Sequence, residues 1–248
     1  MNKVALITGS SRGIGAASAL LLAQKGYAVC INYKQNQAAA NTLLKQIHAL
    51  GVPAIAYAAD VSQEQQVDDL FTAIDLQLGP ITALVNNAAI LLPQSPLVDM
   101  NQGRVNQLLT TNVTSAFLCC KYAIKRMGTS YGGAGGAIVN VSSAAARIGS
   151  PFEYIDYAAS KGAIDTLTKG LSVELAEQKI RVNGVRPGFI NTDMHADGGE
   201  PNRLERIRSS IPMQRGGQPD EVAEAICWLL SEQASYVTGS IVDVAGGR

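Results

Sequence analysis

The chain alternates between two kinds of hydrophobic pattern. Short, mostly apolar runs predict β-strands at Val4–Thr8, Ala28–Tyr33, Ala54–Ala58, Ala83–Asn86, Ala137–Ser142, Val182–Val185 and Ile241–Val244. Longer amphipathic segments between them predict helices at Gly13–Lys25, Gln37–Leu50, Gln63–Gln77, Asn101–Met127, Asp156–Gln178 and Pro219–Leu230. Apolar strands that alternate with helices are typical of a parallel sheet covered on both faces. The pattern therefore predicts an α/β fold with a doubly wound sheet of about seven strands.

No repeat, low-complexity run or block of charge divides the 248 residues, so we expect a single domain over residues 1–248. In an open α/β sheet, ligands bind beyond the carboxyl ends of the strands. The polar residues that follow the predicted strands are therefore the candidate site residues.

Charge and composition exclude several classes of partner. Twenty basic and twenty acidic residues balance, and no basic stripe interleaved with aromatic residues is present, so we expect neither nucleic acid nor an anionic membrane as a partner. The first predicted strand begins too early to leave room for a signal peptide, and no apolar run is long enough to cross a bilayer. We therefore expect a cytoplasmic protein whose partner is a small molecule.

The cysteine and histidine content argues against a metal site. The four cysteines lie in apolar stretches, which predicts buried, reduced thiols at Cys30, Cys119, Cys120 and Cys227. The two histidines, His48 and His195, lie beside no cluster of cysteine or carboxylate. We expect no metal ligands and no Ser-His-Asp hydrolase.

A glycine-rich turn, TGSSRGIG, follows the first predicted strand at residues 8–15. Glycine permits tight turns and close approach of a ligand to the main chain. The helix that follows offers unpaired N–H donors and a partial positive charge at its N-terminus. The spacing of Gly9, Gly13 and Gly15 differs from the G-x-G-x-x-G fingerprint, but its place at the first strand–helix junction favours a Rossmann-type dinucleotide site.

The end of the second strand indicates which dinucleotide binds. It reads Ile31-Asn32-Tyr33-Lys34, without the acidic residue that binds the ribose 2′-hydroxyl of NAD. Arg12, inside the glycine turn, and Lys34 are cations suited to a 2′-phosphate. We therefore expect NADP(H); the alternative is that both are solvated surface charges.

Tyr157 and Lys161 lie four residues apart in DYAASKGAI, on one face of a predicted helix. A phenol has a reference pKa of about 10, so proton transfer near pH 7 requires a shift of roughly three units, about 4 kcal/mol. One ammonium group ~4 Å away supplies about that much at an effective dielectric constant of ~20. The pair can therefore act as a general acid and base, although the spacing alone is common on surface helices.

Three further sites follow strands or interrupt apolar helices. Ser143 follows the fifth predicted strand and can donate a hydrogen bond to a carbonyl oxygen that gains charge, whereas alternation directs Ser142 the opposite way. The small residues and amides of VNNAA, residues 85–89, suit the wall of a cofactor site. Asn112 is a polar residue in a mostly apolar helix, a position that is usually exposed or locally bonded.

Together these motifs resemble those of the short-chain dehydrogenase/reductase family, over essentially the whole chain. The shared motifs are the glycine turn, Asp60-Val61, NNAA at residues 86–89, Asn112, Ser143, the Tyr157–Lys161 pair and RPGFINT at residues 186–192. The resemblance implies a catalytic tetrad of Asn112, Ser143, Tyr157 and Lys161. It also implies hydride transfer between nicotinamide and a carbonyl carbon, with Tyr157 as proton donor.

The resemblance assigns a role to each of the other residues of the tetrad. Lys161 is expected to lower the pKa of Tyr157 and to bind the nicotinamide ribose. Ser143 is expected to hold the substrate oxygen, and Asn112 to hold a water that links Lys161 to solvent.

The resemblance also implies where the cofactor binds. It places Asp60 and Val61 at the adenine ring, Asn87 and Ala88 beside the adenosine ribose, and the segment 187–192 at the nicotinamide end. The full expected cofactor set is Gly9, Ser11, Arg12, Gly13, Ile14, Gly15, Asn32, Tyr33, Lys34, Asp60, Val61, Asn87, Ala88, Ala89, Tyr157, Lys161, Pro187, Gly188, Ile190 and Thr192.

Two positions depart from the family pattern. Ala89 stands where the family usually has glycine, and the interval from Ser143 to Tyr157 is one residue longer than in many members. The sequence most resembles bacterial glucose 1-dehydrogenase-like and 3-oxoacyl-carrier-protein reductase-like members. We expect an NADP(H)-dependent reductase of a small or medium ketone, an aldehyde or a 3-oxoacyl thioester. Sugar oxidation and a non-catalytic NADP-binding scaffold are the alternatives.

Residues from about 191 to 215 are expected to form a substrate loop. Its glycines predict that it is disordered without ligand and closes over substrate. The cleft is expected to be lined by residues 144–154, including Pro151, Phe152 and Tyr154, and by Met194 and Met213. That mostly apolar lining, without a cluster of basic side chains, favours a neutral substrate.

A homotetramer is expected from the two long helices that carry Asn112 and Tyr157. The second helix has small residues at Ala158, Ala159, Gly162 and Ala163, a surface that permits close helix approach. Members of the resembled family commonly pair through these helices. The alternative is that this face packs on the sheet.

Overall fold

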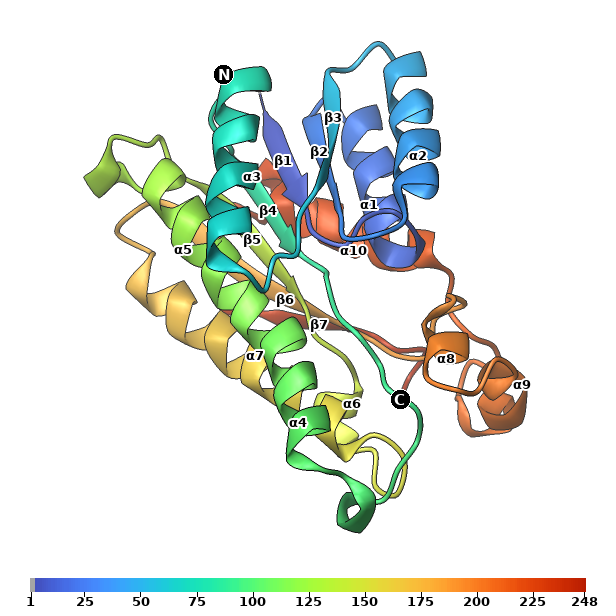
Figure 1. The fold of residues 1–248 in the computed structure, drawn as a ribbon. Helices are drawn as coiled ribbons and strands as arrows, with labels where there is room; N and C mark the ends of the chain where they lie inside the picture. Colours follow the sequence, from blue (N-terminus) through green and yellow to red (C-terminus); the bar gives the residue numbers. More distant parts are fainter. Residues whose placement is uncertain (1–2) are drawn as a thin grey trace.

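A computed structural model describes residues 3–248 of the chain. In this range seven strands form one parallel sheet in the order β3-β2-β1-β4-β5-β6-β7 (Figure 1). The strands are β1 Val4–Ile7, β2 Ala28–Tyr33, β3 Ala54–Ala58, β4 Ala83–Asn86, β5 Gly136–Val141, β6 Ile180–Pro187 and β7 Ile241–Val244. The helices are α1 Gly13–Gln24, α2 Gln37–Ala49, α3 Glu64–Gln77, α4 Gln102–Leu109, α5 Ser115–Met127, α6 Ala145–Ile148, α7 Ile155–Glu174, α8 Met194–Asp197, α9 Arg203–Ile207 and α10 Pro219–Leu230.

The two faces of the sheet bury separate hydrophobic clusters. On β1, Ala5 and Ile7 pack into a cluster with α1, α2 and α10. The alternate residues Val4 and Leu6 pack into a second cluster with α3 and α5, and residues at the end of α7 also contact it. Figure 1 shows α1, α2 and α10 on one side of the sheet and α3, α5 and α7 on the other. The predicted doubly wound α/β fold is thus confirmed.

The predicted helix at Asn101–Met127 is interrupted in the structure. Between α4 and α5, residues Thr110–Thr114 form a turn of π-helix, and Asn112 lies buried within it. Such π-helical turns are rare and occur frequently at functional sites. The hydrophobic pattern continues through the turn, so it did not reveal the interruption.

Strand β6 is longer than predicted. It pairs with β5 from Ile180 to Val185, and Arg181 lies inside this paired segment. The Arg181 guanidinium donates to the carbonyl oxygens of Leu229 and Ser231 at the end of α10. A charged residue therefore sits in a buried strand because helix-terminal carbonyls satisfy it.

The four cysteines are buried, free thiols, as predicted. Burial raises the pKa of each thiol. Within residues 3–248, no helix is both long enough and apolar enough to span a membrane.

Candidate active site

The glycine turn connects β1 to α1 and packs against the segment that follows β4. Gly9 has a φ of 61°, and a Cβ there would lie 2.9 Å from the Cα of Ala88. A Cβ on Gly15 would lie 2.6 Å from Nδ2 of Asn87. Packing against the segment after β4 therefore requires glycine at these two positions, apart from the close approach of a phosphate that the sequence predicts.

The start of α1 nevertheless fits a phosphate group. In the described chain, no side chain caps this helix and no acidic residue lies in its first turn. Free N–H donors and the helix dipole suit an anion at such a terminus. Among the expected cofactor residues of this turn, Ile14 lines the cavity described below. Ser11 and Gly13 are half-buried.

Arg12 and Lys34, expected at a 2′-phosphate, each contact carboxylates in this structure. The Arg12 guanidinium pairs with Asp193 and Asp197 of the segment after β6. Lys34 Nζ lies 2.7 Å from Oδ2 of Asp60. Burial opposes ionisation of Asp60, but hydrogen bonds from Lys34 and Ser62 outweigh it and lower the pKa of that carboxyl. A 2′-phosphate would have to compete with these carboxylates for both cations.

The side chains at the end of β2 are used within the protein. Asn32 is buried; its Oδ1 accepts a hydrogen bond from Gly9 N at 3.1 Å, and its Nδ2 donates to Ala59 O at 3.0 Å. Tyr33 is buried in the cluster beneath α1 and α2. Val61 is likewise buried in the opposite cluster. The side chains of these three expected cofactor residues therefore make contacts within the protein that stabilise the site.

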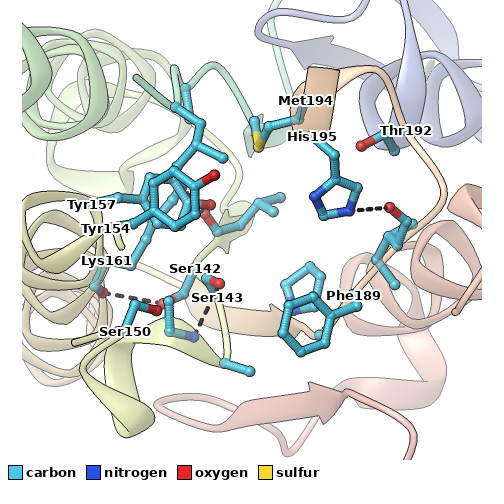
Figure 2. Close-up of a pocket in the computed structure, with 18 of the residues that line it drawn as sticks. Ser142, Ser143, Ser150, Tyr154, Tyr157, Lys161, Phe189, Thr192, Met194 and His195 are labelled. Atoms are coloured by element: carbon cyan, nitrogen blue, oxygen red, sulfur yellow. Dashed lines mark hydrogen bonds between the residues drawn. The ribbon is translucent and has the colours of Figure 1, made fainter. Parts of the chain in front are cut away.

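A cavity of about 110 Å³ contains three of the four expected catalytic residues, Ser143, Tyr157 and Lys161 (Figure 2). It lies beyond the carboxyl ends of the central strands, where the strand order reverses between β1 and β4. Expected cofactor residues also line it: Ile14, Asn87, Ala89, Pro187, Gly188, Ile190 and Thr192. Asn87 Nδ2 donates to Thr8 O at 2.9 Å, which holds the end of β4 to the glycine turn.

Lys161 is buried one helical turn from Tyr157 on α7. Its Nζ donates to Val141 O at 2.8 Å and lies 5.6 Å from the centroid of the Tyr157 ring. Burial lowers the pKa of Lys161 to about 8, although Asp165 opposes this shift. The ammonium group thus lies beside the ring of Tyr157 and is hydrogen-bonded to the main chain of β5.

Burial raises the pKa of Tyr157 to about 12, although the Ser143 hydroxyl and the Arg203 charge act in the opposite direction. Lys161 was expected to lower this pKa. In the structure the Arg203 charge acts in that direction, whereas Lys161, with a pKa of about 8, would lose its own charge before the buried phenol ionises. Tyr157 is therefore a protonated phenol near neutral pH.

The adjacent serines have different surroundings, as strand alternation predicted. Ser142 is buried and its Oγ donates to Lys161 O at 3.1 Å. Ser143 Oγ accepts from Ala145 N at 3.1 Å and lies on the same wall as Tyr157 (Figure 2). The structure thus brings Ser143, not Ser142, to the phenol.

Asn112 is buried in the π-helical turn and does not line the cavity. Its Oδ1 accepts from Ile90 N at 2.8 Å, and its Nδ2 donates to Ile90 O at 3.0 Å and to Ser160 Oγ at 3.2 Å. These contacts fix the segment after β4 against α7.

The segment 191–215, expected to be the substrate loop, contains regular structure. It contains α8 and α9 and is held by several polar contacts. Tyr154 Oη donates to Gly198 O at 3.1 Å, and Gln94 Nε2 donates to Glu200 Oε2 at 2.7 Å.

The cavity lining also differs from expectation. Phe152 is 83% exposed, and neither it nor Pro151 or Met213 lines the cavity. Tyr154 and Met194 line it as expected, together with Phe189, His195 and Arg203. Sequence reasoning missed Arg203, because an arginine among the charges of RLERIR has the pattern of a solvated helix.

Comparison with known proteins identifies the family of the chain. Residues 9–248 match a family model described as enoyl-(acyl carrier protein) reductase. The chain is 61% identical to an uncharacterized oxidoreductase of Escherichia coli, YgfF, with 99% of each chain covered. The chain belongs to the short-chain dehydrogenase/reductase family. The resemblance found in the motifs is thereby confirmed.

Two further relatives indicate the range of this short-chain dehydrogenase/reductase family. The 3-oxoacyl-(acyl-carrier-protein) reductase FabG of Staphylococcus aureus is 36% identical, over 100% of this chain and 98% of the relative. The crystal structure of acetoin dehydrogenase YohF from Salmonella typhimurium superimposes with a TM-score of 0.87 at 37% identity, covering 100% of this chain and 97% of that one. The protein is thus an oxidoreductase of a family that uses nicotinamide cofactors.

Proposed function

We propose that this chain is an NADP(H)-dependent oxidoreductase that interconverts a small ketone or aldehyde and its alcohol. The observation that carries the proposal is the protonated Tyr157 phenol in one cavity with Ser143 and the buried Lys161. A general acid, an oxyanion donor and a buried cation are the groups that carbonyl reduction requires.

The chain's own residues handle the oxygen and the proton. A nicotinamide cofactor, when bound, supplies or accepts the hydride. Burial raises the pKa of Tyr157 to about 12, so the downward shift expected from the sequence is not found and the phenol holds its proton near pH 7. Tyr157 would donate that proton to a carbonyl oxygen that gains charge. Ser143 donates a hydrogen bond to the same oxygen. The buried Lys161 ammonium favours the phenolate that remains.

The same geometry assigns parts of the cofactor to residues. The uncapped start of α1 would hold the pyrophosphate, and Pro187, Ile190 and Thr192 would hold the nicotinamide end. Arg12 and Lys34 would take the 2′-phosphate in exchange for their present carboxylate partners.

A similar solved structure favours a small substrate. Acetoin dehydrogenase is among the similar structures. A 3-oxoacyl thioester is the second candidate, supported by the similarity to FabG.

The proposal is tested by NADPH oxidation with a panel of small ketones, aldehydes and acetoacetyl thioesters, beside NADP with glucose. We expect ketone reduction. Tyr157→Phe should lower turnover by about 100-fold or more, the range of general acid catalysis, and leave NADPH binding nearly unchanged. Tyr131→Phe, which alters an exposed tyrosine outside the cavity, is the matched control. Glucose oxidation without ketone reduction, or substantial turnover by the Tyr157 variant, would contradict the proposal.

A further inference from the structure

Two polar side chains of the cavity have so far been given no contact with the substrate, Arg203 of α9 and His195 of α8. Both come from the segment after β6. Figure 2 shows His195 on the wall opposite Tyr157 and Ser143. A substrate bound at Tyr157 would therefore extend toward His195, and Arg203 also lines the cavity.

Arg203 is a buried, fixed cation with spare donors. It is 6% exposed, and its guanidinium carbon lies 4.4 Å from the ring centroid of Tyr154 and 5.4 Å from that of Phe189. Within residues 3–248 its side chain makes one hydrogen bond, from Nη2 to Glu153, and Nε is buried without a partner. Since a guanidinium carries five N–H donors, Arg203 has donors left for a ligand.

His195 offers a spare acceptor. Its Nε2 lies 2.9 Å from Ile190 O, and because a carbonyl oxygen only accepts, Nε2 carries the hydrogen. Burial lowers the pKa of His195, although the Ile190 carbonyl opposes this, so the ring is neutral at pH 7. Nδ1 then presents a lone pair, and it is buried without a partner among the described residues.

The charge around Arg203 is already balanced. Glu153 pairs with Arg203 and with Arg206, and Arg206 also pairs with Glu200, so two cations face two carboxylates. A further anion would leave this cluster with excess negative charge and would face the lone pair of His195. The donor on Arg203 and the acceptor on His195 together match a hydroxyl group, which accepts and donates.

We propose that Arg203 and His195 bind a second oxygen of the substrate, so that the preferred substrate is a neutral ketone with a neighbouring hydroxyl group. This inference rests on the proposed function. The hydroxyl oxygen accepts from Arg203 and its hydrogen is donated to His195 Nδ1. On reduction, the carbonyl carbon gains hydride and its oxygen gains the Tyr157 proton, while the nicotinamide is oxidised; the product is a vicinal diol and the bound hydroxyl is unchanged.

The first test compares substrates on the wild-type protein with NADPH. 3-Hydroxy-2-butanone, which has the second oxygen, should have a kcat/KM at least tenfold above that of 2-butanone, which lacks it, because an analogue without the oxygen leaves buried polar groups unpaired. Pyruvate, of similar size but anionic, should be a poorer substrate than 3-hydroxy-2-butanone. Equal use of the two ketones, or preference for pyruvate, would overturn the inference.

The second test assigns the preference to residues. Arg203→Gln should raise KM for 3-hydroxy-2-butanone at least tenfold and leave KM for 2-butanone within about threefold. Arg206→Gln is the matched control, because Arg206 lies on the same helix and pairs with the same Glu153 but is half exposed and outside the cavity. Arg206→Gln should leave KM for both ketones unchanged. An equal rise in KM for both ketones in Arg203→Gln would show a purely structural role and overturn the inference.

A third variant separates the two contacts and does not depend on the folding of Arg203→Gln. His195→Leu should lower kcat/KM for 3-hydroxy-2-butanone but not for 2,3-butanedione, which has no hydroxyl hydrogen to donate. The same loss with both substrates would contradict the assigned role of Nδ1. If the wild-type protein reduces no ketone with NADPH or NADH, the proposed function itself fails; reduction of 2-butanone without preference overturns this inference alone.

Discussion

At the scale of single residues, Ser142 and Ser143 show how one position along a strand decides a role. Both serines border the cavity, but the Ser142 hydroxyl donates to the main chain of α7, whereas that of Ser143 lies near the Tyr157 phenol. Because side chains alternate across a strand, the two hydroxyls cannot exchange roles without a shift of register.

This difference gives a prediction for two adjacent variants. Ser143→Ala should lower kcat/KM for ketone reduction by about 100-fold, the usual effect of removing an oxyanion donor. Ser142→Ala removes a buried hydrogen bond to Lys161 O and should cost about 1 kcal/mol of stability with a much smaller effect on rate. Kinetics and thermal unfolding of both variants check this; a larger rate loss in Ser142→Ala would contradict the assignment.

At the scale of elements, α7 places Tyr157, Lys161 and Asp165 at intervals of one turn. Asp165 raises the pKa of Lys161 against the larger effect of burial, and Oδ2 of Asp165 also lies 2.9 Å from Nη2 of Arg186. Burial thus has the larger effect on the charge of Lys161, and the next turn of its own helix opposes that effect.

The pH dependence of the reaction should follow this arrangement. The folded pKa of Lys161, about 8, is below its ordinary value, so the ammonium is present below pH 8 and is lost as the pH rises through it. Asp165→Asn should lower this pKa further and move the alkaline limb of the kcat profile to lower pH. Arg186→Gln, which leaves the Asp165 charge less compensated, should move it to higher pH. Shifts in the same direction for both variants would contradict the account.

The glycine turn and the end of β2 lead to a prediction about the cofactor. NADPH should bind more tightly than NADH, and Arg12→Ala should reduce that margin by about tenfold, as expected for a charge-assisted contact. Asp197→Asn, which frees Arg12 from a competing carboxylate, should tighten the binding of NADPH and leave the affinity for NADH unchanged. Titrations at two salt concentrations check this, because added salt should weaken the binding of NADPH more than that of NADH. Equal affinities in the wild-type protein would contradict NADP(H) specificity.

At the scale of the whole molecule, we predict a homotetramer that pairs through the outer face of α5 and α7. Phe117 and Val173 are 52% and 71% exposed on these helices. A Cβ on Gly162 or Gly170 would meet nothing within 4 Å, so no contact inside the chain requires glycine there. Ala158 is buried, whereas Ala159 is exposed. Only part of the small-residue surface of α7 therefore packs inside the chain.

We predict a solution mass of about four times the 26.0-kDa chain. Val173→Asp should shift the protein to smaller species, because a charge on an apolar contact face is costly to bury. Leu76→Asp, at an exposed leucine of α3, is the control and should leave the mass unchanged. Light scattering at micromolar concentration checks both; a wild-type mass near 26.0 kDa would rule out the tetramer.

The sequence by itself determined the features that depend on local periodicity. Apolar runs and helical spacing located the strands and the main helices, and the four-residue interval placed Tyr157 and Lys161 on one face of α7. Strand alternation separated Ser143 from Ser142. These relations need only neighbouring residues, because the period of a strand or helix is fixed by the backbone.

The tertiary structure decided what depends on residues far apart in the chain. It set the strand order, tied Arg12 to Asp197, and directed Lys161 to the carbonyl of Val141. It also buried Arg203 between Tyr154 and Phe189, where the sequence pattern indicated a solvated charge. No local pattern encodes these contacts, since each depends on which surfaces meet when the sheet and its helices pack.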